Sequence, residues 1–161
     1  MHRLEEKGLS FLIQRTVERD QDEHEFATLH CMPRELPADL TIVVVEDHDD
    51  ARRYIEIFLR QLGASVIGAR NAIEGLEAIK THRPTLVLSD IMMPAGDGFE
   101  LLRQIRAWES GGERVVPVIA MTALVSSADG QRILNAGFSA YLRKPFTPDK
   151  LLETIQSVLN D

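Results

Sequence analysis

The chain has 161 residues, of which 44% are apolar and 27% are charged, as is ordinary for a soluble globular protein. Its net charge of −7 argues against nonspecific nucleic-acid binding, which requires an excess of lysine and arginine. The apolar runs are too short to span a bilayer, and the amino terminus lacks the pattern of a signal peptide. The only cysteine, Cys31, cannot form an intrachain disulfide, so we expect a cytoplasmic protein.

The N-terminal part of the chain differs from the rest. Apolar residues at rough helical spacing are followed by an acidic, polar stretch at 18–25. Pro33 and Pro37 then interrupt the chain just before the first strand-like run. We therefore predict an N-terminal extension at 1–38, made of a helix and a linker, and a folded domain at 39–161.

From residue 39 onward, short apolar runs alternate with segments of helical periodicity. The runs that predict strands lie at 41–45, 65–68, 85–89, 115–121 and 139–143. The segments that predict helices lie at 51–62, 73–79, 99–108, 128–136 and 148–159. Asn71 and Asp97 are expected to cap the second and third helices. Five strand–helix repeats predict an α/β fold in which helices cover both faces of a parallel sheet.

Reactive side chains fall at the ends of the predicted strands. Glu46 and Asp47 follow the first strand, and Asp90 follows the third. Thr122 follows the fourth strand and Lys144 the fifth. Because parallel α/β sheets carry their sites at the carboxyl ends of the strands, we expect these five residues to form one cluster. Packing alone does not require such polar groups there.

The chemistry of this predicted cluster is specific. Three carboxylates repel one another and need a cation, and oxygen ligands favour a hard divalent ion such as Mg²⁺. No histidine or cysteine is expected to converge there, which argues against zinc. A carboxylate can attack a phosphoryl group to form an acyl phosphate. The metal and Lys144 would neutralise the phosphoryl charge, and the Thr122 hydroxyl would donate a hydrogen bond to it.

Four segments resemble the signature segments of response-regulator receiver domains: VVVEDHDD, LVLSDIMMPAGDGFELL, VIAMTA and YLRKPF. They occur in the family's order and at similar separations, and the resemblance covers about residues 40–160. It implies a doubly wound, flavodoxin-like sheet of five parallel strands in the order 2-1-3-4-5. It also implies a signalling switch that is controlled by phosphorylation.

The resemblance assigns the acidic residues their roles. Asp90 would be the phosphoacceptor. Asp47, Asp90 and the backbone carbonyl of Met92 would bind Mg²⁺ directly, whereas Glu46 would act on the ion through water.

The resemblance also implies how the phosphoryl group is recognised. Thr122 and Lys144 would contact it, and Tyr141 matches the family's switch aromatic, which turns inward when the threonine moves. An edge-strand tyrosine with a hydrated hydroxyl explains Tyr141 equally well. Lys144 and Pro145 match a Lys-Pro pair whose peptide bond is usually cis. Four histidines are expected to be solvated, outside the cluster and without a phosphorelay role: His24, His30, His48 and His82.

Three functions are considered. The first is a stand-alone receiver, expected because the chain ends two residues after the apolar face of the last helix. It would accept a phosphoryl group from a histidine kinase or phosphotransfer protein and act by contact with an unknown downstream protein. The second is a receiver detached from a hybrid histidine kinase. In the second, residues 1–38 would be a linker remnant or a short segment that docks on a partner. An amphipathic helix in this extension would otherwise form a homodimer, dock on its own domain or bind a partner.

The third function is a phosphatase with an aspartate nucleophile. Such enzymes need a second acid two residues after the nucleophile, and Met92 occupies that position here. We therefore expect no enzyme activity beyond self-catalysed phosphotransfer and slow autodephosphorylation.

Overall fold

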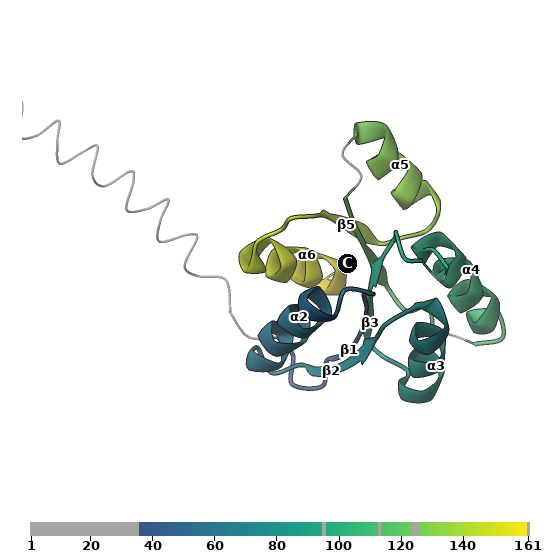
Figure 1. Cartoon of the computed structure of the whole chain (residues 1–161). Helices are drawn as coiled ribbons and strands as arrows, with labels where there is room; N and C mark the ends of the chain where they lie inside the picture. Colours follow the sequence, from purple (N-terminus) through teal and green to yellow (C-terminus); the bar gives the residue numbers. More distant parts are fainter. Residues whose placement is uncertain (1–35, 95, 113, 124–125, 161) are drawn as a thin grey trace, which may run out of the picture. The chain divides into compact units, whose positions relative to one another are not determined.

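The computed structural model describes residues 36–160, apart from residues 95, 113 and 124–125. Strands and helices alternate along this part of the chain (Figure 1). The strands are β1 (Thr41–Val45), β2 (Ser65–Ala69), β3 (Leu86–Asp90), β4 (Val118–Thr122) and β5 (Ala140–Arg143). The helices are α2 (Asp49–Gln61), α3 (Ala72–His82), α4 (Gly98–Glu109), α5 (Ser127–Asn135) and α6 (Pro148–Asn160). The helix predicted within 1–38 lies outside the described residues.

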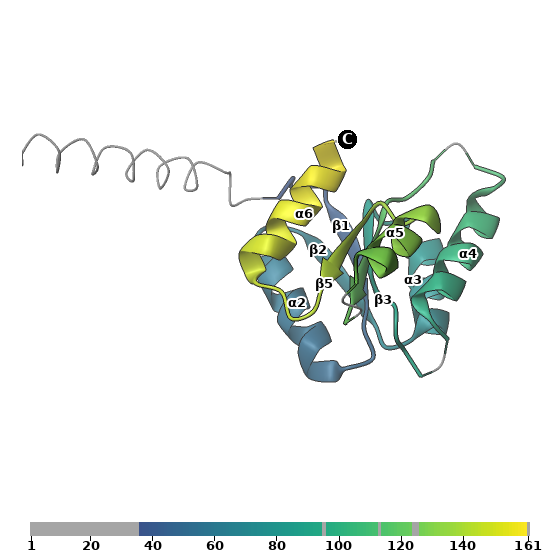
Figure 2. The same cartoon turned by 90° about the horizontal axis from the view of Figure 1, so that it is seen from above.

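The strands form one parallel sheet in the order β2-β1-β3-β4-β5. This confirms the predicted α/β, doubly wound, flavodoxin-like fold. β3 and β4 are buried along their whole length, as expected for strands covered on both faces. Figures 1 and 2 show α2 and α6 on one face of the sheet and α3, α4 and α5 on the other.

Alternating residues of the central strands feed two separate cores. In β1, Val43 and Val45 pack in a cluster with residues of α3, α4 and α5. Ile42 and Val44 point to the opposite face and pack with residues of α2 and α6. This two-residue period follows from strand geometry, and it explains why the run TIVVV carries no polar residue after Thr41.

Local polar contacts fix where helices begin. The Asn71 side chain accepts a hydrogen bond from the N–H of Glu74 at 2.9 Å, and Asp97 accepts one from Glu100 at 2.8 Å. Both predicted caps are confirmed. α5 begins with a capping box, in which the side chains and backbone N–H groups of Ser126 and Asp129 bond reciprocally.

The polypeptide packs into the core slightly before β1. Leu36, which we placed in the extension, is 6% exposed, and its N–H donates to the carbonyl of Leu62 at 3.0 Å. It belongs to the same core cluster as Ile42. The division at residues 38 and 39 stays a prediction, because most of the extension lies outside the described residues.

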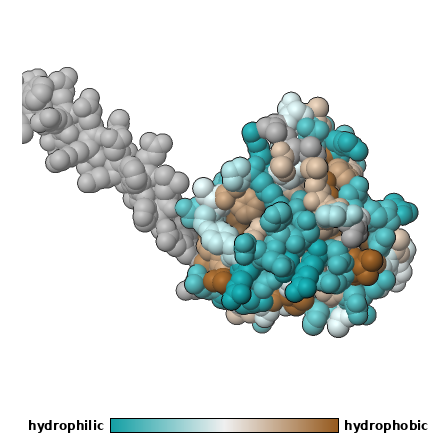
Figure 3. Space-filling view, viewed as in Figure 1, coloured by the Kyte–Doolittle hydropathy of each residue, from teal (hydrophilic) through white to brown (hydrophobic). Residues whose placement is uncertain are grey.

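The face of the domain seen in Figure 3 is mainly hydrophilic. On the face seen in Figure 3, apolar side chains form small, separate patches. Among the described residues, we find no helix whose length and apolar character would let it cross a bilayer.

Candidate functional site

The sheet register brings the predicted acidic residues together. β1 lies beside β3 with Val45 opposite Ser89, so Glu46 and Asp90 each follow one member of this pair. Asp90 is also paired with Met121 of β4, the neighbour of Thr122. Asp90 and Thr122 are the last residues of their strands rather than the first residues of the loops. Glu46, Asp90 and Thr122 are all buried.

Lys144 joins this cluster from the loop after β5. Its Nζ lies 2.6 Å from Oε2 of Glu46 and 2.9 Å from Oδ2 of Asp90. Its backbone N–H donates to the carbonyl of Thr122 at 2.7 Å, which ties this loop to β4. The peptide bond between Lys144 and Pro145 is cis, as the resemblance implied.

The surroundings of Lys144 keep it charged. Burial by itself would lower the pKa of the ammonium, but hydrogen bonds and charge attraction from Glu46 and Asp90 outweigh burial. The pKa of Lys144 is therefore raised above its ordinary value. The residue carries a full positive charge at neutral pH.

Asp90 is held by backbone groups around it. Its Oδ1 accepts a hydrogen bond from the N–H of Met92 at 3.1 Å, while its Oδ2 faces Lys144. Gly98, the first residue of α4, approaches the Asp90 backbone closely: a Cβ at this position would lie 2.6 Å from the Asp90 carbonyl oxygen. A side chain at Gly98 would push α4 away from the end of β3.

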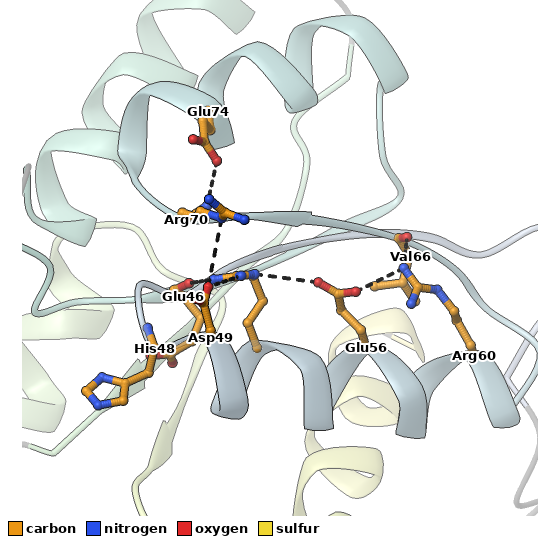
Figure 4. A network of polar contacts seen from close by, with 9 residues as sticks. Glu46, His48, Asp49, Glu56, Arg60, Val66, Arg70 and Glu74 are labelled. Atoms are coloured by element: carbon orange, nitrogen blue, oxygen red, sulfur yellow. Dashed lines mark hydrogen bonds and ion pairs between the residues drawn. The ribbon is translucent and has the colours of Figure 1, made fainter.

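Glu46 and Asp47 form a second part of the site together with His48. One potential ligand atom from each of these three residues lies within 4.8 Å of the others. His48 also lines the same surface groove as Asp47 and Asp90. His48 is exposed, as expected, but it lies beside Glu46 and Asp47 rather than apart from them. The backbone N–H of His48 donates to Oε1 of Glu46 at 3.3 Å, while its ring points away from Glu46 in Figure 4.

Tyr141 lies on the edge strand β5, where its side chain is 41% exposed. The ring lies against Gly130 of α5, because a Cβ on that glycine would come within 2.6 Å of the tyrosine hydroxyl. Tyr141 is therefore partly solvated and packed on the backbone of α5. Its predicted role as a switch stays a prediction.

Comparison with known proteins shows the family to which this chain belongs. A family model described as the response regulator receiver domain matches residues 42–156. The chain belongs to the response regulator receiver domain family. The matched segment contains all five residues that the sequence predicted to cluster at the strand ends.

Curated relatives and solved structures match a similar share of this chain. The chain is 33% identical over 121 residues to the polar-differentiation response regulator DivK of Brucella anthropi, covering 75% of this chain and 97% of DivK. It is 39% identical over 119 residues to an uncharacterized 14.6 kDa protein of Leptolyngbya boryana, covering 74% and 89%.

Among solved structures, the chemotaxis protein CheY4 of Vibrio cholerae matches with a TM-score of 0.69 and 28% identity, covering 74% of this chain and 98% of CheY4. The BeF3-activated N-terminal receiver domain of Klebsiella pneumoniae RstA matches with a TM-score of 0.67 and 30% identity, covering 75% and 99%.

Receiver domains bind Mg²⁺ at an acidic pocket, and the charges of this site fit that ion. Glu46, Asp47 and Asp90 bring three carboxylates to one groove, and within the described residues Lys144 is the cation bonded to two of them. The cluster therefore retains an excess of negative charge. Carboxylate oxygens at this density are suited to a hard divalent ion.

Proposed function

We propose that this receiver accepts a phosphoryl group on Asp90 and passes the signal to a downstream protein by direct contact. The observation that carries this proposal is the position of Lys144, whose ammonium lies between Glu46 and Asp90. A fixed cation beside a buried carboxylate stabilises the negative charge that a phosphoryl group brings.

The donor in this proposal is a phosphohistidine of a histidine kinase or phosphotransfer protein. An oxygen of the Asp90 carboxylate attacks the phosphorus atom. The P–O bond forms as the P–N bond breaks, and the imidazole leaves with the electron pair. Lys144 neutralises charge on the phosphoryl oxygens, and we expect its ammonium to move from the carboxylates toward the new phosphate.

Mg²⁺ belongs to the same proposal. Asp47, Asp90 and the carbonyl of Met92 would hold the ion directly, and Glu46 would hold it through water. When bound, the ion would supply positive charge in addition to that of Lys144. The protein itself positions these ligands at the ends of adjacent strands.

The response is proposed to leave the site through Thr122 and Tyr141. The Thr122 hydroxyl donates a hydrogen bond to the new phosphate, which draws β4 and its following loop inward. Tyr141 then leaves its place against Gly130 and turns inward. The protein acts in the cytoplasm as a switch rather than as an enzyme. The segment 1–38 is proposed to be an extension that docks on a partner, on its own domain or on a second copy.

The test is phosphorylation by acetyl phosphate with Mg²⁺, followed by mass measurement of the intact protein. We expect one added phosphate on the wild type and none on Asp90→Asn. Asp97→Asn is the matched control, since Asp97 lines the same groove but serves as a helix cap, a role that asparagine also performs. Phosphorylation of Asp90→Asn at the wild-type rate would overturn the assignment.

A further inference from the structure

Arg52 contacts Glu46, Asp49 and Glu56, which Figure 4 labels within a larger polar network. It lies in the first turns of α2, and its side chain is only 11% exposed. One guanidinium nitrogen, Nη1, donates to the backbone carbonyl of Glu46 at 2.8 Å. Nη2 donates to Asp49, and Nε lies 3.7 Å from Oε1 of Glu56. All three nitrogens therefore face acceptors.

The Glu46 carbonyl, which Arg52 contacts, lies just after the end of β1. The Glu46 N–H continues the sheet by donating to the carbonyl of Ala69 at 3.0 Å, and β2 ends at that residue. After Ala69, β2 offers no further N–H to β1. The Glu46 carbonyl accepts its hydrogen bond from the Arg52 guanidinium instead. The Glu46 carbonyl also belongs to the planar peptide group that joins Glu46 to Asp47. Holding this plane restrains how the backbones of the two acidic residues are oriented relative to each other.

The Arg52 guanidinium also pairs with the carboxylate of Glu56. Glu56 lies between Arg52 and Arg60, with its Oε2 3.1 Å from Arg60. Its carboxylate comes close to the backbone of β2 because position 68 is glycine: a Cβ there would lie 1.9 Å from Oε1 of Glu56. The missing side chain at Gly68 therefore lets Glu56 hold Arg52 in the position from which it reaches Glu46.

We propose that Arg52 is a positioning residue for the Mg²⁺-binding pair Glu46 and Asp47. It touches neither the phosphoryl group nor the ion, and acts through the peptide plane between the two acids. Mg²⁺ demands near-ideal octahedral geometry, so a small rotation of this plane weakens binding. The inference rests on the proposed function, since it assigns these acids to Mg²⁺.

The experiment measures the Mg²⁺ dissociation constant by calorimetry on the full chain, together with the melting temperature in EDTA. We expect Arg52→Ala to weaken Mg²⁺ binding by about 10- to 100-fold, the usual effect of removing a group that orients metal ligands. Arg52→Lys should be intermediate, because a single ammonium can reach the carbonyl but cannot also hold Asp49 and Glu56.

Arg60→Ala is the matched control. Arg60 lies on the same helix, pairs with the same Glu56 and donates to the carbonyl of Val66 at 2.8 Å, but makes no contact with Glu46 among its described interactions. Its variant should bind Mg²⁺ within about twofold of the wild type. A purely structural role for Arg52 would instead lower the melting temperature and leave the dissociation constant unchanged. That result overturns the inference.

Gly68→Ala provides a second variant that keeps the Arg52 side chain but disturbs its surroundings, since the new Cβ would lie 1.9 Å from Oε1 of Glu56 and 3.2 Å from Cδ of Arg52. The new methyl group displaces the carboxylate of Glu56 and should weaken Mg²⁺ binding several-fold. Should Arg52→Ala fail to fold, wild-type Mg²⁺ affinity in both Arg52→Lys and Gly68→Ala overturns the inference. Failure of the proposed function has a different signature, because the wild type itself would then take no phosphate from acetyl phosphate.

Discussion

Lys144 and Glu46 are 98 residues apart in the sequence, yet Nζ of Lys144 lies 2.6 Å from Oε2 of Glu46. The same ammonium lies 2.9 Å from Oδ2 of Asp90. One cation is thus shared by two buried carboxylates at the ends of the adjacent strands β1 and β3. Asp47 adds a third negative charge beside them. The remaining negative charge is the electrostatic basis for binding a divalent ion.

Replacing Lys144 by methionine should make the stability of the domain depend on Mg²⁺. Methionine keeps much of the apolar stem but removes the ammonium that Glu46 and Asp90 share. We expect the free energy of unfolding in EDTA to fall by about 2 kcal/mol, because the carboxylates lose their partner. Saturating Mg²⁺ should restore more stability to the variant than to the wild type. Urea unfolding with and without the ion measures both effects.

Lys150→Met is the control for this comparison. Lys150 is exposed and pairs with Glu153 on the surface, so its loss should cost about 0.5 kcal/mol or less. Equal Mg²⁺ stabilisation of the wild type and Lys144→Met would contradict the charge balance described above. Since the pKa of Lys144 is raised, its contribution is complete below the ordinary lysine pKa and is lost only as pH rises through the higher folded value.

Asp49 should titrate below its ordinary range. A hydrogen bond from Arg52 is the largest cause, and the charges of Arg52 and Arg70 add to it. Because the folded pKa of Asp49 is lowered, its contact with Arg52 contributes to stability above the ordinary aspartate pKa. The contribution is lost as pH falls through the folded value. A carbon-13 NMR titration should show a low midpoint in the wild type.

The matched comparison for this titration is Arg52→Ala, in which the Asp49 midpoint should rise toward the ordinary value. Arg60→Ala should leave the Asp49 midpoint unchanged, since Arg60 pairs with Glu56 instead. An unchanged midpoint in Arg52→Ala would show that Arg52 does not hold Asp49 in solution.

The fold could be predicted from the sequence because its signals are local. The run at 41–45 has only apolar residues after Thr41 and forms a strand with these bounds. Asn71 and Asp97 were recognisable as caps because a cap satisfies a backbone N–H three residues ahead. The start of β4 was predicted too early, at residue 115. The Glu109 carboxylate takes the Val116 N–H, a tertiary contact that no local pattern reveals.

The cluster at the strand ends was also predictable, because topology alone brings those residues to one edge. The positions of two residues near this cluster, His48 and Arg52, could not be predicted from the sequence. His48 is expected to be solvated and apart from the cluster; it is exposed, but the path of the chain after β1 places it beside Glu46 and Asp47. Arg52 stands out by no pattern in the sequence. Its contact with the Glu46 carbonyl depends on where β2 ends, which the sequence does not show.

Glu109 should contribute stability without affecting the site. It is 8% exposed, and its carboxylate accepts hydrogen bonds from the Val116 N–H and from Arg106, each at 2.7 Å. Glu109→Ala leaves the Val116 N–H without this acceptor, so we expect a loss of about 2 kcal/mol in unfolding free energy. Mg²⁺ affinity should stay at the wild-type value, since Val116 precedes β4 and the site lies after it.

The control for Glu109 is Glu100→Ala on the same helix. Glu100 pairs with Arg103 at the surface, so its removal should have a much smaller effect on unfolding by urea. Wild-type stability of Glu109→Ala would mean that the loop before β4 is held by other contacts.

Gly130 should control the position of Tyr141. A Cβ on Gly130 would lie 2.6 Å from the tyrosine hydroxyl and 2.7 Å from Cζ, so alanine forces the ring to move. Alanine also favours a helix over glycine, so α5 itself should remain folded. If Tyr141 turns inward on activation, Gly130→Ala should favour the inward position without any phosphate. The variant would then resemble the activated state in this region.

Fluorotyrosine NMR can measure this shift directly, because the chain has two tyrosines and Tyr54→Phe assigns the remaining signal to Tyr141. The Tyr141 resonance of Gly130→Ala should move toward the position that the wild type reaches with Mg²⁺ and beryllium fluoride. Gly111→Ala is the control, since a Cβ there meets no atom within 4 Å. Movement of the Gly130→Ala resonance away from the beryllium fluoride position would show that the outward tyrosine is not the inactive one.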